Sequence, residues 1–212
     1  MLVAMTQSPE AANNLAAEWD ERYTDLADRL PLLEPNAVLL TEADALSPGR
    51  ALDIGCGIGV EATWLAARGW RVSALDVSQV ALDRAAGRAR EAGVDVEWRQ
   101  GRIEDAQFGG FDLVTAFYPA LLHSDGHDAE RALLAAVADG GTLLVVHHAD
   151  IDVERANAHG FDPADYVMHD DLVALLGDHW DVRVDRRRPR AKPAGLDGEH
   201  THDDVLLARR LR

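Results

Sequence analysis

The chain has 212 residues and a formal net charge of −16, from 21 basic and 37 acidic residues. Its apolar content of 47% excludes a disordered chain, and its acidic balance argues against a general nucleic-acid binder, since phosphate contact needs a basic surface. The single cysteine, Cys56, excludes an intrachain disulfide, and no apolar run reaches the roughly 18 residues of a membrane span. The first residues lack the basic flank of a signal peptide, so we expect a cytoplasmic protein without a membrane partner.

Two helices are predicted before residue 48. Residues 10–29 place four apolar or aromatic side chains on one helical face, namely Leu15, Trp19, Tyr23 and Leu26. A shorter helix is expected over residues 37–46, between Pro35 and Pro48. We interpret residues 1–47 as an N-terminal helical cap.

Short strands and helices alternate over residues 48–148. We expect strands over residues 50–54, 70–75, 94–98, 111–116 and 142–146, and helices over residues 60–67, 79–92 and 128–138. Such alternation is typical of βαβ units in an α/β fold with an open, doubly wound and mostly parallel sheet. Ligands of such sheets bind at the carboxyl ends of the strands.

The remaining residues, 149–212, are expected to add one helix and a pair of strands to the same single domain, residues 1–212. The helix is predicted near residues 170–176, and the strands over residues 180–184 and 205–210. The long connection between these strands is rich in Pro and Gly, which favours a hairpin with an irregular arm.

The segment Asp53–Gly59 carries the clearest functional signal. It follows a predicted strand and opens a predicted helix, and Gly55, Gly57 and Gly59 would let a ligand approach the backbone. The helix start supplies unpaired N–H groups. Asp76 ends the next strand, where a carboxylate can accept hydrogen bonds from both hydroxyls of a ribose. The pattern predicts a site for an adenosine-containing ligand.

The spacing of the glycines distinguishes between such ligands. A dinucleotide fingerprint reads G-x-G-x-x-G, but Val60 stands where its third glycine would fall. Asp53 would repel a pyrophosphate and attract an ammonium group. The segment also lacks the lysine of a phosphate-binding P-loop. These features favour S-adenosylmethionine (SAM), which carries an amine and a sulfonium but no phosphate.

The segment ALDIGCGIGVEATWLAARGWRVSALDVS resembles the opening motifs of class I SAM-dependent methyltransferases. FDLVTAFYPALL and ADGGTLLVV are similar to the fourth- and fifth-strand segments of that class, and DDVLLARR to the ending of its tellurite-resistance and thiopurine methyltransferase type. The resemblance implies a seven-stranded sheet of order 3-2-1-4-5-7-6 whose last strand is antiparallel. It also implies methyl transfer from SAM to an O, S or N atom of a small molecule, with S-adenosylhomocysteine (SAH) as product and no nucleic-acid partner.

The same resemblance implies roles for individual residues. The loop with Asp53, Cys56 and the three glycines would hold the methionine part, and Asp76 the ribose. Val77 and the backbone of Ile103 would contact adenine. Glu104 is a second candidate for adenine, because Arg102 stands where the family commonly has an acid. Phe117 and Tyr118 would border the transferred methyl group.

Several residues keep two interpretations. Trp19 and Tyr23 are either core residues or part of a helix that closes over the cofactor. Tyr118, His147 and His148 are the candidates for a base that accepts a proton from the acceptor. Cys56 is explained by packing rather than by nucleophilic catalysis.

No metal site is expected, because the nine histidines show no recognised zinc spacing. The basic segment 183–192 is either an edge kept soluble by charge or an arm that recognises an anionic substrate.

Two other functions stay open at this point. One is a nicotinamide-dependent oxidoreductase, which Val60 disfavours. The other is a non-catalytic module that binds an adenosine-containing ligand. The sequence does not indicate the acceptor or the oligomeric state.

Overall fold

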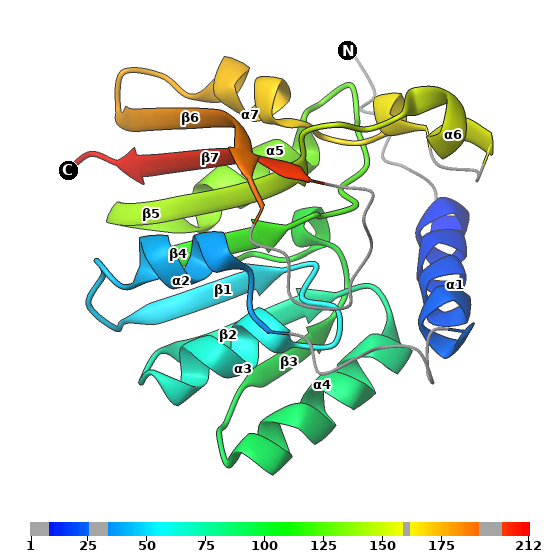
Figure 1. The fold of residues 1–212 in the computed structure, drawn as a ribbon, viewed down its shortest axis with the longest axis horizontal. Helices are drawn as coiled ribbons and strands as arrows, with labels where there is room; N and C mark the ends of the chain where they lie inside the picture. Colours follow the sequence, from blue (N-terminus) through cyan, green and yellow to red (C-terminus); the bar gives the residue numbers. More distant parts are fainter. Residues whose placement is uncertain (1–8, 26–33, 159–161, 191–200) are drawn as a thin grey trace.

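The structure is a computed structural model, which describes residues 9–25, 34–158, 162–190 and 201–212. Seven strands form one sheet in the order β3-β2-β1-β4-β5-β7-β6 (Figure 1). They are β1 (Arg50–Ile54), β2 (Arg71–Asp76), β3 (Glu97–Gln100), β4 (Phe111–Phe117), β5 (Val137–His148), β6 (Trp180–Pro189) and β7 (His202–Arg210). Strand β7 pairs antiparallel with both neighbours, and the other pairs are parallel. The predicted fold class and strand order are confirmed.

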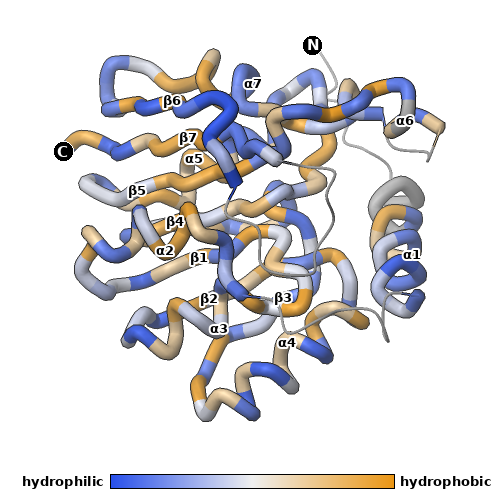
Figure 2. Tube along the Cα trace, viewed as in Figure 1, coloured by the Kyte–Doolittle hydropathy of each residue, from blue (hydrophilic) through white to orange (hydrophobic). Residues whose placement is uncertain are grey.

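Helices cover both faces of this sheet. The described helices are α1 (Pro9–Asp25), α2 (Ala37–Ala43), α3 (Val60–Ala67), α4 (Gln79–Ala92), α5 (Asp128–Ala136), α6 (Val153–Ala158) and α7 (His169–Leu175). Helices α2, α3 and α4 pack on one face, and α5 and α7 on the other. Neighbouring strand residues enter opposite cores, as Leu143 and Leu144 do in β5. The strands of the central sheet are correspondingly apolar in Figure 2.

The third strand begins later than its sequence predicted, at Glu97 instead of Val94. Gly93 ends α4 in a left-handed conformation, and the Val94 N–H donates to the carbonyl of Ala89 at 3.0 Å. This cap uses Val94 to close the helix, so the chain needs two more residues to reach the sheet.

The fifth strand begins earlier than predicted, at Val137, and helix α5 therefore ends at Ala136. Val137 pairs with Phe111 of β4, whereas the main register starts at Leu113 and Thr142. Gly140, at φ 82°, lies in the irregular stretch between the two pairings. The prediction of helix up to residue 138 was wrong because sheet pairing overrides the local helical pattern.

The other elements differ from their predictions mainly in length. Helix α2 ends at Ala43 rather than Leu46, and β2 is shifted by one residue. Strands β6 and β7 extend to Pro189 and back to His202. Helix α6 forms in a region predicted to be loop. The predicted helix 10–29 is confirmed as far as Asp25; Leu26 lies outside the described residues.

Helix α1 lies beyond the carboxyl ends of the parallel strands, on the right in Figure 1. Its Asp20 fixes it to the start of α4, because the carboxylate accepts hydrogen bonds from the Ser78 hydroxyl at 2.6 Å and the Val80 N–H at 3.1 Å. A carboxylate at a helix N-terminus is favourable, since the unpaired N–H groups there are electropositive. The contact places the aromatic face of α1 over the ends of the strands.

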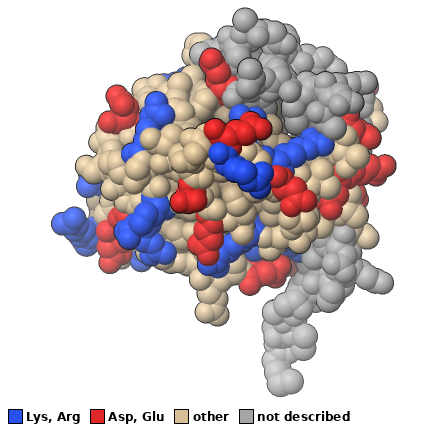
Figure 3. All heavy atoms as spheres, turned by 90° about the horizontal axis from the view of Figure 1, so that it is seen from below, with Lys and Arg blue, Asp and Glu red and all other residues tan. Residues whose placement is uncertain are grey.

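Among the described helices, none is both long and apolar enough to cross a lipid bilayer. On the face shown in Figure 3, acidic and basic side chains lie interspersed rather than in one large field of a single sign.

Replacing Gly59 with alanine is expected to destabilise the protein by about 2–4 kcal/mol. Gly59 has a φ of 73°, and a Cβ there would lie 2.7 Å from both the Ala85 Cβ and the Trp98 ring. Gly69→Ala is the matched control, because Gly69 also has a positive φ, 85°, but has open space around it. Urea denaturation should show the larger loss for Gly59→Ala; equal losses would contradict the packing argument.

Candidate functional site

A pocket of about 320 Å³ opens at the carboxyl ends of β1, β2 and β4, beneath α1. Eight of the residues singled out by sequence line it, namely Trp19, Tyr23, Gly55, Asp76, Val77, Ile103, Phe117 and Tyr118. The walls are largely aromatic and aliphatic, and Asp76 is the acid among the lining residues. A pocket with this position and composition is the best candidate for a ligand site.

The glycine loop forms the floor beside this pocket. Gly55, Gly57 and Gly59 all have positive φ values, between 51° and 73°. A Cβ on Gly57 would lie 2.6 Å from the hydroxyl of Tyr23, so the bare backbone lets α1 close onto the loop. Gly57, Gly59 and Cys56 therefore support the pocket from behind instead of lining it. Burial raises the pKa of the Cys56 thiol, which fits a packing role.

Asp76 connects the loop to the second strand. Its two carboxylate oxygens accept hydrogen bonds from the Gly57 N–H at 2.8 Å and the Ser78 N–H at 2.9 Å. The side chain is 7% exposed, and burial raises its pKa. Each carboxylate oxygen can accept more than one hydrogen bond. The carboxylate is thus held rigidly at the pocket wall and keeps capacity for a ligand hydroxyl.

Asp53 lies under the loop and is 2% exposed. The Thr115 hydroxyl donates to its Oδ1 at 2.7 Å, whereas its buried Oδ2 has no hydrogen-bond partner among the described residues. Burial, followed by repulsion from Glu61, raises the pKa of Asp53 to about 8. Glu61 accepts a hydrogen bond from the Asn36 N–H at 3.0 Å, and burial raises its pKa as well. Three crowded acids around one glycine loop favour a cationic ligand over a diphosphate.

The opposite end of the pocket is less polar. Val77 and Ile103 line it, together with Leu75 and Gly101. Glu104 is not among the lining residues, and its carboxylate forms an ion pair with Arg102. Of these two candidates for adenine contact, Ile103 lines the pocket and Glu104 does not.

Tyr118 follows β4 and has an unusual φ of 50°. Its hydroxyl donates to Asp203 Oδ1 at 3.0 Å and accepts from Asn36 Nδ2 at 2.7 Å. The ring stacks on His148, with 4.1 Å between the centroids, and the Arg190 guanidinium lies 5.1 Å from its centroid. Burial, followed by the charge of Asp203, raises the pKa of Tyr118.

His147 and His148 are adjacent but belong to different environments. Successive residues of a strand face opposite sides of the sheet, so His148 reaches Tyr118 while His147 packs against His169 of α7. His147 is 6% exposed and does not line the pocket. Burial, followed by repulsion from His169, lowers its pKa to about 3. His147 therefore lies away from the pocket, whereas His148 contacts the pocket residue Tyr118.

Residues 51–141 match the model of a family described as a methyltransferase domain. The ubiquinone biosynthesis O-methyltransferase of Marinobacter nauticus is 30% identical over 139 residues, which cover 62% of this chain and 57% of that protein. Its counterpart in Hahella chejuensis is 36% identical over 138 residues, which cover 58% of this chain and 58% of that protein. The chain thus spans somewhat more than half the length of these curated relatives. The matched residues 51–141 contain the glycine loop, Asp76 and Ile103.

Solved structures share this fold over almost the whole chain. The magnesium protoporphyrin IX methyltransferase of Synechocystis PCC 6803, with bound SAH, superimposes with a TM-score of 0.67 and 19% identity, covering 94% of this chain and 99% of that one. TehB from Haemophilus influenzae gives a TM-score of 0.62 and 14% identity, covering 90% and 66%. Identities this low show the fold alone, so the predicted tellurite-resistance and thiopurine type is not confirmed.

Sequence reasoning missed several residues around this pocket. Pro119, Ala120 and Leu121 line the pocket after β4, and Asn36 and Asp203 hold Tyr118. Pro119, Ala120 and Leu121 belong to the quoted segment FDLVTAFYPALL, so the motif marked the place without marking the residues. Asn36 and Asp203 lie far from the motifs, and no local pattern indicates them.

The basic segment 183–192 is largely neutralised by acids of the same chain. Glu42 of α2 pairs with both Arg183 and Arg188, while Arg186 pairs with Asp170 and Asp204, and Arg187 with Asp150. Strand β6 is an edge strand, and charged side chains on an edge hinder pairing with the sheet of another molecule. The ion pairs therefore favour the interpretation of segment 183–192 as an edge kept soluble by charge. Lys192, the last base of the segment, lies outside the described residues.

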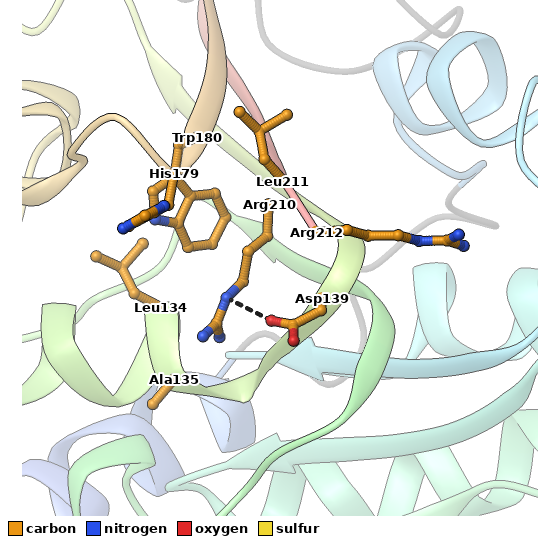
Figure 4. A pocket seen from close by; sticks show the side chains of 8 residues that line it. All are labelled: Leu134, Ala135, Asp139, His179, Trp180, Arg210, Leu211 and Arg212. Carbon is orange, nitrogen blue, oxygen red and sulfur yellow. Dashed lines mark ion pairs between the residues drawn. The ribbon is translucent and has the colours of Figure 1, made fainter.

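Two further features do not define a second candidate site. In the described part of the chain, no group of three His, Cys, Asp or Glu side chains could hold a metal ion. A second pocket, of about 530 Å³, lies where β5 begins and β7 ends, with Arg210 and Asp139 paired across it at 3.1 Å (Figure 4). This is the amino end of the parallel strands, whereas ligands of open α/β sheets bind at the carboxyl ends.

Proposed function

We propose that this protein is a SAM-dependent methyltransferase that methylates a small molecule, with an oxygen atom as the favoured acceptor. The observation that carries the proposal is the group of acids around the glycine loop, above all the buried Asp53 with its unpartnered Oδ2. SAM offers an ammonium group and a sulfonium, which favour the ionised forms of these acids, whereas the diphosphate of a nicotinamide dinucleotide would oppose their ionisation. The names of the curated relatives, ubiquinone biosynthesis O-methyltransferases, support the oxygen acceptor.

In this proposal SAM binds in the orientation that the sequence resemblance implies. Asp53 and the loop through Gly55 would hold the amino-acid part, and Asp76 would accept hydrogen bonds from the ribose hydroxyls. Val77 and Ile103 would enclose the adenine ring, and Phe117 and Tyr118 would border the reacting group. Trp19 and Tyr23 of α1 would cover the ligand and exclude water. The resemblance to the tellurite-resistance and thiopurine type rests on this aromatic pair and on the ending DDVLLARR, and it supports a small acceptor.

Catalysis in this proposal consists mainly of positioning. Bound SAM supplies a methyl group that is already activated by its sulfonium. The chain has to align the acceptor with that group, keep water out and, where the acceptor carries a proton, take it up. Tyr118, with His148 behind it, is the candidate for the last task.

Calorimetry with SAM, SAH and NAD⁺ tests the proposal. We expect SAM and SAH to bind with micromolar or tighter dissociation constants, and NAD⁺ to bind at least 100-fold more weakly. Tight binding of NAD⁺ would favour the oxidoreductase. Tight binding of SAM without methyl transfer to any small molecule of a cell extract, followed with methyl-labelled SAM, would favour a non-catalytic module.

A further inference from the structure

The hydroxyl group of Tyr118 lies between two elements that are remote in sequence. Asn36 precedes helix α2, and Asp203 is the second residue of β7. Both contact the Tyr118 oxygen, at 2.7 Å and 3.0 Å. Asp203 is 1% exposed, so its carboxylate is withdrawn from water at the end of the sheet where Tyr118 lines the pocket.

The direction of these hydrogen bonds is fixed by Asn36. Its Oδ1 accepts from the Val38 N–H at 2.8 Å and so caps the start of α2. The amide nitrogen therefore points to Tyr118, and it can only donate. The Tyr118 proton is consequently directed to Asp203, and one lone pair of the Tyr118 oxygen stays available.

The partly exposed side chain of His148 lies beside both Asp203 and Tyr118. His148 and Asp203 are opposite residues in the antiparallel pair of β5 and β7, with 3.9 Å between His148 Nδ1 and Asp203 Oδ1. The His148 side chain is 26% exposed and also stacks on Tyr118. Tyr118, Asp203 and His148 thus lead from the pocket to the protein surface.

We propose that Tyr118 takes the proton of a hydroxyl acceptor while Asp203, acting through Tyr118, receives the tyrosine proton. The inference rests on the proposed methyltransferase function and names its acceptor class: a neutral hydroxyl, such as a phenol. Phenol hydroxyls ionise near pH 10, whereas thiols ionise near 8.5 and need less help at neutral pH.

The step balances as follows. The acceptor oxygen forms a bond to the methyl carbon, whose bond to sulfur breaks, and the sulfur keeps that electron pair. The hydroxyl proton moves to the Tyr118 oxygen, and the Tyr118 proton moves to Asp203. The products are the methyl ether, SAH and a neutral Asp203 carboxyl group, which passes its proton by way of His148 to solvent.

The test uses phenols of graded acidity with the intact protein. The probes are phenol, 4-cyanophenol, 4-nitrophenol and pentafluorophenol, whose hydroxyl groups are increasingly acidic, with thiophenol and aniline for comparison. The variants are Tyr118→Phe and Asp203→Asn. Asp204→Asn is the matched control, because Asp204 is the next residue of β7 and faces the other side of the sheet, where it pairs with Arg186. Calorimetry with SAM establishes that each variant retains its fold and cofactor site.

We expect kcat/KM of the wild type to depend weakly on phenol acidity. Tyr118→Phe and Asp203→Asn should lose about 10²–10⁴-fold with phenol and recover with pentafluorophenol, which arrives ionised. Asp204→Asn should match the wild type. An equal loss with all four phenols would show a merely structural role and overturn the relay. Methylation of thiophenol or aniline but of no phenol, or no turnover of any probe despite SAM binding, would also overturn it. Failure to bind SAM would instead contradict the proposed function.

Absorbance titration of the tyrosines gives a readout that does not need turnover. The chain has three tyrosines, and the charge of Asp203 helps to raise the pKa of Tyr118. Asp203→Asn should therefore lower the pH at which one of the three tyrosines titrates, and Tyr118→Phe should remove that titration step. An unchanged titration in Asp203→Asn would contradict the coupling on which the relay depends.

Discussion

Replacing Asp76 with asparagine is expected to weaken SAM binding by about 10–150-fold. In the proposed complex, the Asp76 carboxylate accepts hydrogen bonds from two ribose hydroxyls, and hydrogen bonds to a charged group contribute about 1.5–3 kcal/mol each. The asparagine amide can accept only one of them, and its nitrogen would face the Gly57 N–H or the Ser78 N–H. The substitution should therefore also lower the free energy of unfolding, by about 1–3 kcal/mol.

Calorimetry with SAM and SAH separates the two effects. Both ligands carry the same ribose, so both affinities should fall together. Asp83→Asn is the matched control, because Asp83 is an exposed acid of α4 that accepts a hydrogen bond only from Gln79 among the contacts described. An analogue without the 2′-hydroxyl should bind the wild type more weakly but lose little further in the variant. A SAM affinity within threefold of the wild type would remove Asp76 from the ribose site.

The central part of the fold could be predicted because its signals are local. Strand β1 and helices α3 and α4 have the predicted bounds, since an apolar run ends at a glycine loop and the caps Ser78 and Gly93 enclose α4. Strand β6 shows the limit of such signals. After Val184 the strand continues through Asp185, three arginines and Pro189. The arginines form ion pairs with other elements, so no apolar alternation indicates that the strand continues.

The candidate site likewise contains residues that local motifs indicate and residues that only the tertiary structure brings together. The loop could be predicted because its glycines lie within one strand-loop-helix unit. Asp76 could be predicted because the next strand ends at it. The contacts of Tyr118 could not be predicted, because Asn36 and Asp203 are 82 and 85 residues away and meet it only when β7 inserts beside β5. His147 and His148 looked equivalent until the strand register placed them on opposite faces.

Binding of SAM is expected to release a proton and to become stronger as the pH rises from about 6 to 7.5. Burial and the repulsion of Glu61 raise the pKa of Asp53 to about 8, so the carboxyl group is largely neutral at pH 7 in the ligand-free protein. A ligand ammonium beside it favours the ionised form and expels the proton. Affinity should therefore rise by up to about tenfold per pH unit in this range. Calorimetry in phosphate and in Tris, which differ in ionisation enthalpy, measures the proton released.

Asp53→Asn should abolish this proton release, and it should also change how the ligand-free protein responds to pH. The unfolded chain ionises Asp53 near its ordinary pKa, while the folded chain holds the proton up to about pH 8. The free energy of unfolding should thus fall as the pH rises from about 4 to 8, by at most about 1.4 kcal/mol per unit from this group. Urea denaturation across that range should give a flatter profile for Asp53→Asn than for the wild type and the Asp83→Asn control. Identical slopes would mean that Asp53 is ionised in the ligand-free protein, and the buried carboxyl group would then not be the source of the pH dependence of binding.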